Sequence, residues 1–229
     1  MKIIHLSDTH VDPEILHKID SQKRFKQALD HIKDNHTDAD HFMITGDLTH
    51  FGNDESYQIF IKILSEAGLP DRLYPKLILG NHDNRENFKK NFPNIKTDKN
   101  GFVQYVEKDS DKVFIFLDTN LANTDAGHLC DKRQQWFKDT LDREQKNKIY
   151  IFMHHNPLAI GHINSDSIGL VQREDLKKIF LQYQNSIEHI FFGHQHVTSS
   201  GKYLDITFSS PRSTWSPLIP NFLDRYRLG

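Results

Sequence analysis

Short apolar runs rich in Ile, Val and Phe recur along the chain, and longer amphipathic segments separate them. Runs of this length are typical of β-strands, and the apolar residues of the intervening segments recur at helical spacing. We expect strands at residues 2–6, 41–45, 74–79, 112–117, 148–153, 189–192 and 203–208. This order predicts an α/β fold in which helices pack on the faces of a mixed sheet.

Helical spacing is found at residues 21–36, 53–67, 131–144 and 172–184. The first of these segments begins at Ser21, a residue type that caps helices, and the second stops at Gly68. Residues 93–101 and 159–169 are expected to be loops, and the proline-rich end after Phe208 predicts a loop that packs near the sheet ends. No repeat, low-complexity tract or linker divides the sequence, which predicts one domain over residues 1–229.

The charge and the cysteine content indicate which compartment and which partners to expect for the protein. A formal net charge of −2 gives no electrostatic attraction to nucleic acid or to anionic membrane. The single cysteine, Cys130, excludes an internal disulfide, and the N-terminal sequence is too polar for a signal peptide. No apolar stretch approaches the roughly 20 residues of a membrane-spanning helix. We therefore expect a cytoplasmic protein without a membrane partner.

Polar strings of a restricted kind directly follow the expected strands. The strings are Asp8-Thr9-His10, Gly46-Asp47, Gly80-Asn81-His82-Asp83, His154-His155 and Gly193-His194-Gln195-His196. Loops that leave the carboxyl ends of strands line a common crevice in α/β folds, so these strings are expected to converge. Their metal-ligand side chains are Asp8, His10, Asp47, Asn81, His154, His194 and His196.

Mixed Asp, Asn and His ligands suit transition metals such as Mn, Fe and Zn. Seven ligands exceed what one ion with room for substrate would use, so we expect two divalent or transition metal ions. Asp47 is the natural bridge between them, because it stands alone after its strand and its carboxylate has two oxygens. Two such ions lower the pKa of a shared water and neutralise a phosphoryl group, which predicts phosphoester hydrolysis by an attacking hydroxide.

His82 stands between a proposed ligand and Asp83, so its imidazole is expected to face the site without binding metal. It would then donate a proton to the departing oxygen or stabilise the phosphoryl oxygens. Asp83 would orient the ring and raise its basicity. We therefore expect His82 and Asp83 to be catalytic.

Taken alone, each string is also compatible with an ordinary turn, and the metal interpretation rests on their common order and placement. His50 and His162 are candidates for lining the pocket, and Arg212 and Trp215 for contacting a phosphate or a base. His155 has a ligand-supporting, a substrate-facing or a structural role. His5 is expected to be a satisfied residue of the first strand. The remaining histidines are expected to be solvated on helix or loop surfaces: His17, His31, His36, His128 and His189.

The ordered set of motifs closely resembles the calcineurin-like metallophosphoesterase superfamily over nearly the whole chain. The resemblance implies a four-layer α-β-β-α sandwich, in which two mixed sheets are flanked by helices and a di-metal site lies at the sheet edge. By position, it implies a first metal at Asp8, His10, Asp47 and His196. It implies a second metal at Asp47, Asn81, His154 and His194, with His82 as the catalytic histidine.

Four longer strings are similar to the class III cyclic nucleotide phosphodiesterases: IIHLSDTH, ITGDLTHFG, MHHNPLAIG and GHLCDKRQQWF. Asn156 departs from that branch, which usually has His or Pro there, and many relatives continue beyond the final RYRLG. The resemblance implies a small phosphodiester substrate, with cyclic AMP or cyclic GMP as the first candidates, and by analogy a homodimer.

Rival functions remain within the same superfamily. Related branches hydrolyse glycerophosphodiesters, and the motifs do not separate a phosphomonoesterase. A nuclease would need a basic groove or stacking aromatic residues, and no Lys/Arg cluster lies near the motifs, so a nucleic-acid partner is not expected. A non-catalytic scaffold is disfavoured because all seven ligand positions and His82 are present.

Overall fold

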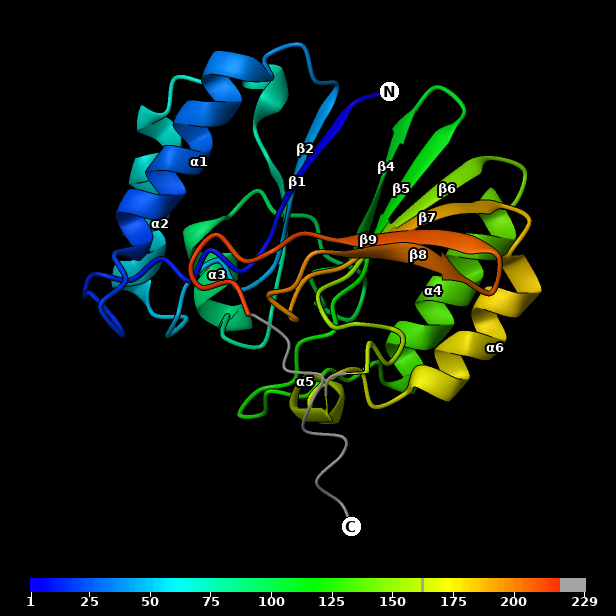
Figure 1. Cartoon of the computed structure of the whole chain (residues 1–229). Helices are drawn as coiled ribbons and strands as arrows, with labels where there is room; N and C mark the ends of the chain where they lie inside the picture. The colour runs from blue at the N-terminus through cyan, green and yellow to red at the C-terminus, as the bar shows by residue number, and fades with distance from the viewer. Residues whose placement is uncertain (162, 219–229) are drawn as a thin grey trace.

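The computed structural model describes residues 1–161 and 163–218. Two β-sheets lie face to face between two layers of helices, with α1 and α2 outside one sheet and α4 and α6 outside the other (Figure 1). The expected four-layer α/β arrangement is confirmed. Among the described residues, no helix combines the length and the apolar character needed to cross a membrane.

The first sheet has three parallel strands in the order β1 (Ile3–Leu6), β2 (His41–Thr45) and β3 (Lys76–Ile78). Because its described strands are all parallel, only the second sheet is mixed. The carboxyl ends of the three strands therefore meet at one edge, where the loops carrying Asp8, Asp47 and Asn81 begin.

The second sheet has six strands in the order β4 (Tyr105–Asp109), β5 (Lys112–Phe116), β6 (Lys148–Phe152), β7 (Ile187–Phe191), β9 (Ile206–Ser210) and β8 (Ser199–Tyr203). β5, β6, β7 and β9 run parallel, whereas the edge strands β4 and β8 pair antiparallel with their neighbours. The loops carrying His154 and His194 thus leave adjacent parallel strands.

The first helix layer contains α1 (Ser21–Asn35), α2 (Asp54–Glu66) and α3 (Arg85–Asn91). The second contains α4 (Asp131–Glu144) and α6 (Arg173–Tyr183), and the short α5 (Ile163–Ser167) precedes α6. Side-chain oxygens of Asp20, Asn53 and Asn84 cap the first three helices by accepting from backbone N–H groups of the first turn. The cap of α1 is thus Asp20, not Ser21.

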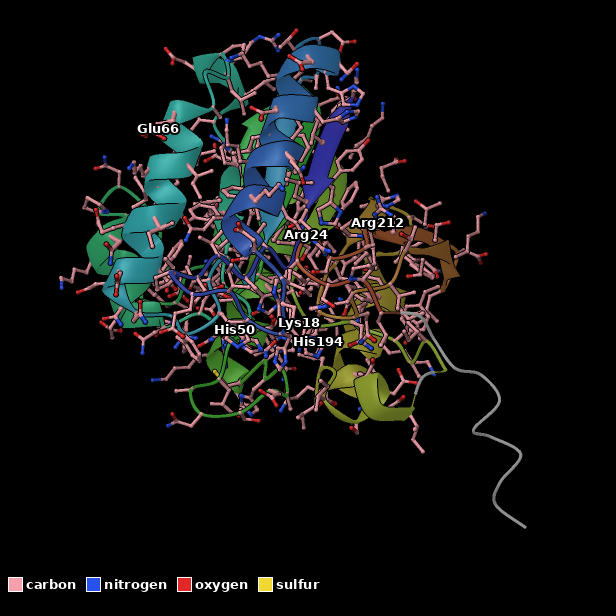
Figure 2. All side chains as sticks on the ribbon, turned by 60° about the vertical axis from the view of Figure 1, so that its left-hand side comes forward. Lys18, Arg24, His50, Glu66, His194 and Arg212 are labelled. Atoms are coloured by element: carbon pink, nitrogen blue, oxygen red, sulfur yellow. The ribbon has the colours of Figure 1, made fainter. Side chains whose placement is uncertain are left out.

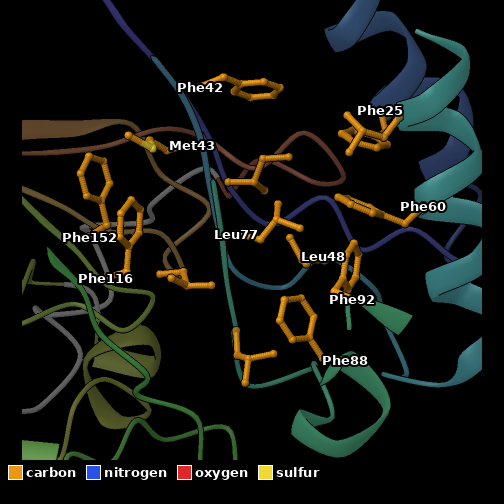
Figure 3. Packing of buried hydrophobic residues seen from close by; sticks show 14 of the residues in the cluster. Phe25, Phe42, Met43, Leu48, Phe60, Leu77, Phe88, Phe92, Phe116 and Phe152 are labelled. Carbon is orange, nitrogen blue, oxygen red and sulfur yellow. The ribbon is translucent and has the colours of Figure 1, made fainter. Parts of the chain in front are cut away.

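One apolar cluster joins the two sheets, and rings of the second sheet stack on one another within it. Figure 3 shows Phe116 and Phe152 on one side of the first sheet and Phe25 and Phe60, from α1 and α2, on the other. Phe152 stacks on Phe116 with ring centroids 5.0 Å apart, and on Phe191 of the next strand at 4.6 Å. A separate apolar cluster fills the space between the second sheet, α4 and α6. Rigid sheets packed in this way fix the strand ends from which the polar loops depart.

The expected strands differ from the observed strands in three places. The segment 203–208 is not one strand, because Leu204 and Asp205 adopt left-handed conformations (φ 54° and 63°) and turn the chain from β8 into β9. The segment 74–79 contains a strand only from Lys76, since a 3-10 turn at Asp71–Leu73 precedes it. β4 was not expected.

Two other segments differ from the expectation of irregular structure. α3 follows the Gly80–Asp83 string directly, where no helix was expected. The expected loop 159–169 contains α5. In the final segment, residues 211–218 form the expected loop, and Trp215 N–H approaches the carbonyl of Asp8 at the sheet ends.

Candidate metal centre

All five polar strings converge at the carboxyl ends of β1, β2, β3, β6 and β7. Five candidate ligands have a left-handed backbone, which non-glycine residues rarely adopt: Asp8 (φ 56°), His10 (45°), Asp47 (48°), His194 (70°) and His196 (54°). Strained conformations of this kind persist where the surrounding structure holds them, and they cluster at functional sites.

Two glycines permit the close approach of these loops. Gly46 has φ 91°, and a Cβ on it would lie 2.6 Å from Gly80 N and 2.7 Å from His154 Nδ1. A Cβ on Gly80 would lie 2.1 Å from Asp47 Oδ1. All three distances are shorter than packing allows, so glycine at these positions is a condition for the position of the Asp47 carboxylate.

One group of donor atoms comes from Asp8, His10, Asp47 and His196, whose ligand atoms all lie within 4.8 Å of one another. Nε2 of His196 is 3.5 Å from Asp8 Oδ1 and 3.2 Å from Nε2 of His10. Asp8, His10 and Asp47 are almost completely buried. These four residues match the first metal set that the sequence resemblance implied.

A second group comes from Asn81, His154 and His194. Asn81 Oδ1 lies 3.1 Å from His154 Nε2 and 3.0 Å from His194 Nδ1. Oδ2 of Asp47 stands between the two groups, 3.5 Å from His10 Nε2 and 3.4 Å from His154 Nε2. All seven candidate ligands are thus brought together, with Asp47 in the position expected of a bridge.

Three of these rings donate a proton outward to a backbone carbonyl. The pairs are His154 Nδ1 with Thr45 O (2.7 Å), His194 Nε2 with Ile168 O (3.0 Å) and His196 Nδ1 with Ser216 O (2.7 Å). In a neutral ring the inward nitrogen then carries a lone pair. The inward nitrogens His154 Nε2 and His194 Nδ1 both lie beside Asn81 Oδ1. Once His154 gives up its inward proton, these three atoms are converging acceptors that a cation can satisfy, so the residues fit a metal ion.

The ionisation of the buried groups fits the same conclusion. Burial opposes ionisation of Asp8, yet the neighbouring His196 and His154 hold the pKa of this carboxyl at about 2. His154 and His10 likewise hold the pKa of Asp47 well below its usual value in spite of burial. Burial lowers the pKa of His10 to about 3 and that of His194 to about 4. Burial opposes protonation of His154 and His196, yet Asp47 raises the pKa of His154 to about 9 and Asp8 raises that of His196. The cluster thus pairs ionised carboxylates with two neutral imidazoles and two protonated ones, whose protons a bound cation would displace.

His82 lies at the edge of the cluster, and its ring contacts none of the carboxylates in the described part of the chain. Its backbone N–H donates to Asp47 Oδ1 at 2.8 Å, and ring Nδ1 is 2.8 Å from the carbonyl oxygen of His50. The expectation that Asp83 orients this ring is wrong. The buried Asp83 carboxylate instead accepts from Gly80 N (2.9 Å) and from the hydroxyl of Tyr57 (3.0 Å), and it fixes the loop.

The other candidate residues differ in whether they contact the site. His50 joins the site, with its Nδ1 3.4 Å from His10 Nδ1. His155 is structural, since its nitrogens contact Thr119 Oγ1 (2.7 Å) and the carbonyl of Asp125 (3.2 Å). Trp215 covers the site, with its ring centroid 4.7 Å from that of His10.

Arg212 is exposed and lies apart from His50 and His194 (Figure 2). His162 lies outside the described residues. His5 is satisfied by Thr45 Oγ1 at 2.8 Å, as expected. His189 was expected to be solvated on a surface, but it belongs to β7 and hydrogen-bonds Thr207 and Ser209.

Asn120 contributes to the site and was missed. Its Nδ2 donates to the carbonyls of Gly80 (2.7 Å) and Asp83 (2.9 Å), and closes the loop that carries Asn81 and His82. Its position after an expected strand is the signal that could have revealed it.

Carboxylates, an amide and histidines that meet at the strand ends of such a sandwich define a metal-dependent phosphoesterase. Residues 1–198 match the sequence model of one family, the calcineurin-like phosphoesterases. The chain therefore belongs to the calcineurin-like phosphoesterases, as its motifs predicted.

Curated relatives refine this placement. A protein of Rhodopseudomonas palustris named a probable cyclic nucleotide phosphodiesterase is 31% identical, over 93% of this chain and 77% of its own length. A probable glycerophosphodiester phosphodiesterase of Arcobacter nitrofigilis is 28% identical, over 92% of this chain and 78% of its own length. The expected resemblance to the cyclic nucleotide phosphodiesterase branch is confirmed.

The fold itself has solved counterparts. A dimetal phosphatase from Danio rerio superimposes with a TM-score of 0.74 at 11% identity, covering 93% of this chain and 87% of that one. At this identity the likeness concerns the fold alone.

Proposed function

We propose that this protein hydrolyses a small phosphodiester, with a 3′,5′-cyclic nucleotide as the substrate, by means of two transition metal ions. The observation that carries the proposal is the position of Asp47 Oδ2, 3.5 Å from His10 Nε2 and 3.4 Å from His154 Nε2. One carboxylate oxygen thus lies between the two groups of donors, which supports a dinuclear centre.

Asp8, His10, Asp47 and His196 would hold the first ion, and Asp47, Asn81, His154 and His194 the second. When bound, two such ions supply an activated water and neutralise the charge that develops on a phosphoryl group. Mn, Fe and Zn all suit this donor set. The backbone carbonyls behind the rings accept from the outward nitrogens and so direct the inward nitrogens of His154, His194 and His196 at the ions.

His82 would act on the leaving group. The carbonyl of His50 keeps a proton on Nδ1, so Nε2 is the nitrogen that can protonate the departing oxygen. His82 and Asn81 also line a cavity of about 440 Å³, to which Phe51 and Asn123 contribute. A leaving alcohol in this cavity would lie beside the proton donor.

The choice of a phosphodiester is supported by the relatives, which are named as cyclic nucleotide or glycerophosphodiester phosphodiesterases. The 28% identity to the Arcobacter nitrofigilis protein makes a glycerophosphodiester the second candidate substrate.

The test is hydrolysis of cyclic AMP, cyclic GMP, glycerophosphoethanolamine and bis(p-nitrophenyl) phosphate by manganese-loaded protein. Asp47→Ala controls for contaminating activity. Turnover of a cyclic nucleotide that is lost in Asp47→Ala is the expected result. Turnover of the glycerophosphodiester alone would transfer the assignment to the second candidate. No turnover of any diester would overturn the proposal.

A further inference from the structure

A second cavity borders the candidate metal centre on the side of His194 and His196. It has a volume of about 240 Å³, and its wall includes Gln195, Trp215 and Ser216. Sites for whole drug-sized molecules span roughly 300–1,000 Å³, so this cavity suits one ring of a substrate rather than an entire molecule.

Gln195 is 1% exposed, and within the described part of the chain neither Oε1 nor Nε2 of its side chain has a hydrogen-bond partner. The indole Nε1 of Trp215 is also buried without a partner there. Buried polar groups are nearly always paired, and an unpaired one calls for an explanation. The unpaired amide of Gln195, in the wall of this cavity, points to a ligand that supplies both a donor and an acceptor.

The cavity wall is held in place by the metal-binding loops. Trp215 N–H approaches the carbonyl of Asp8, and the N–H of Leu218 donates to the carbonyl of His196 at 2.9 Å. The Trp215 ring centroid lies 6.0 Å from that of His196. A substrate group in this cavity is therefore adjacent to a phosphoryl group at the metal centre.

The chemistry of the walls selects a neutral planar group. None of the described residues that line the cavity is Lys or Arg, so it offers no cation for a second phosphate. An amide that donates and accepts side by side pairs with adenine, which presents an amine next to a ring nitrogen. The aromatic face of Trp215 suits a stacked base.

We propose that Gln195 and Trp215 form a base-recognition pocket for a 6-aminopurine, which makes an adenine cyclic nucleotide the preferred substrate. This proposal rests on the phosphodiesterase function proposed above. Gln195 would read the amine and the ring nitrogen through its amide, and Trp215 would cover the ring.

The experiment compares kcat/KM for cyclic AMP with that for cyclic purine riboside monophosphate, which lacks only the 6-amino group. Wild type is expected to prefer cyclic AMP roughly tenfold, the effect of one hydrogen bond to a buried partner. Gln195→Leu should abolish this preference. Thr214→Val is the matched control, because its buried hydroxyl also lacks a partner among the described residues but lines a different cavity, and it should retain the preference.

The results that would overturn the base-recognition pocket differ from the result that would contradict the phosphodiesterase function. A preference that is absent in wild type, or that survives in Gln195→Leu, overturns the base-recognition pocket. So does a wild-type protein that prefers cyclic GMP, or one that cleaves bis(p-nitrophenyl) phosphate but no cyclic nucleotide. A wild-type protein that cleaves neither kind of diester contradicts the phosphodiesterase function itself. If Gln195→Leu does not fold, the comparison of cyclic AMP with cyclic purine riboside monophosphate on the wild type still decides, because absence of the preference there overturns the pocket.

Discussion

Replacement of His82 by alanine should slow hydrolysis in proportion to the basicity of the leaving group. The ring lies at the edge of the donor cluster, where the His50 carbonyl fixes Nδ1 and leaves Nε2 for the leaving oxygen. The backbone N–H of His82, which donates to Asp47 Oδ1 at 2.8 Å, is kept in His82→Ala. The variant therefore removes the proton donor while the contact of the loop with the Asp47 carboxylate remains.

The expected loss of rate in His82→Ala follows from the role of His82 as a general acid. A positioned general acid contributes about 10²–10⁴-fold, or ~3–5 kcal/mol of transition-state stabilisation. An alkoxide leaving group needs all of this assistance, because it departs as a strong base. A p-nitrophenolate needs little of it, so its hydrolysis should fall by less than about tenfold.

The assay is a series of diesters that differ only in a p-nitrophenyl, phenyl or methyl leaving group, cleaved by wild type, His82→Ala and His31→Ala. His31 is an exposed histidine of α1 and serves as the control that should not change the rates. The plot of log kcat/KM against leaving-group pKa should become steeper in His82→Ala only. An equal loss on all three esters would show that His82 stabilises the phosphoryl oxygens or the loop and is not the acid.

Three further results are expected. Gly80→Ala would place a Cβ 2.1 Å from Asp47 Oδ1, so activity should fall by about 10²-fold, whereas Gly201→Ala on β8 should leave the initial rate unchanged. Chelation should lower the Tm of wild type by roughly 5–10 °C for each site that was filled at about 100 times its Kd, as measured by calorimetry, and an unchanged Tm would argue against bound metal. Burial lowers the pKa of His5 from 6.5 to about 3. Between these two pH values the side chain is neutral in the folded state and protonated in the unfolded chain. The stability that His5 contributes is present above pH 6.5 and is lost as the pH falls. Between about pH 6 and pH 4 in urea titrations, the free energy of unfolding of metal-free His5→Gln should therefore fall by ~1.4 kcal/mol less per pH unit than that of metal-free wild type.

The hydrophobic pattern predicted the buried strands and missed the edges of the second sheet. β2 and β5 are largely apolar runs in which four of the five residues are buried, and their signal is strong. β4 and β8 lie at the two edges, where polar and charged residues are usual, as in the SSGKY sequence of β8. Their pairing depends on neighbouring strands that the local sequence does not reveal.

The site, too, could be predicted from the sequence only in part. The ligand types and their order after strands could be read from the sequence, because parallel strand ends must meet. The partner of His82 could not, since it is the backbone carbonyl of His50, which has no sequence signature. Asp83 is next to His82 in the chain, but its carboxylate turns to Gly80 N and Tyr57. Sequence proximity was therefore a poor guide to side-chain contact.

The most direct test of the account is the number of metal ions bound per chain, measured by mass spectrometry after manganese loading and removal of free ion. The position of Asp47 Oδ2 between His10 and His154 predicts two ions in wild type and at most one in Asp47→Ala. One ion or none in wild type, or two retained in Asp47→Ala, would contradict the dinuclear centre.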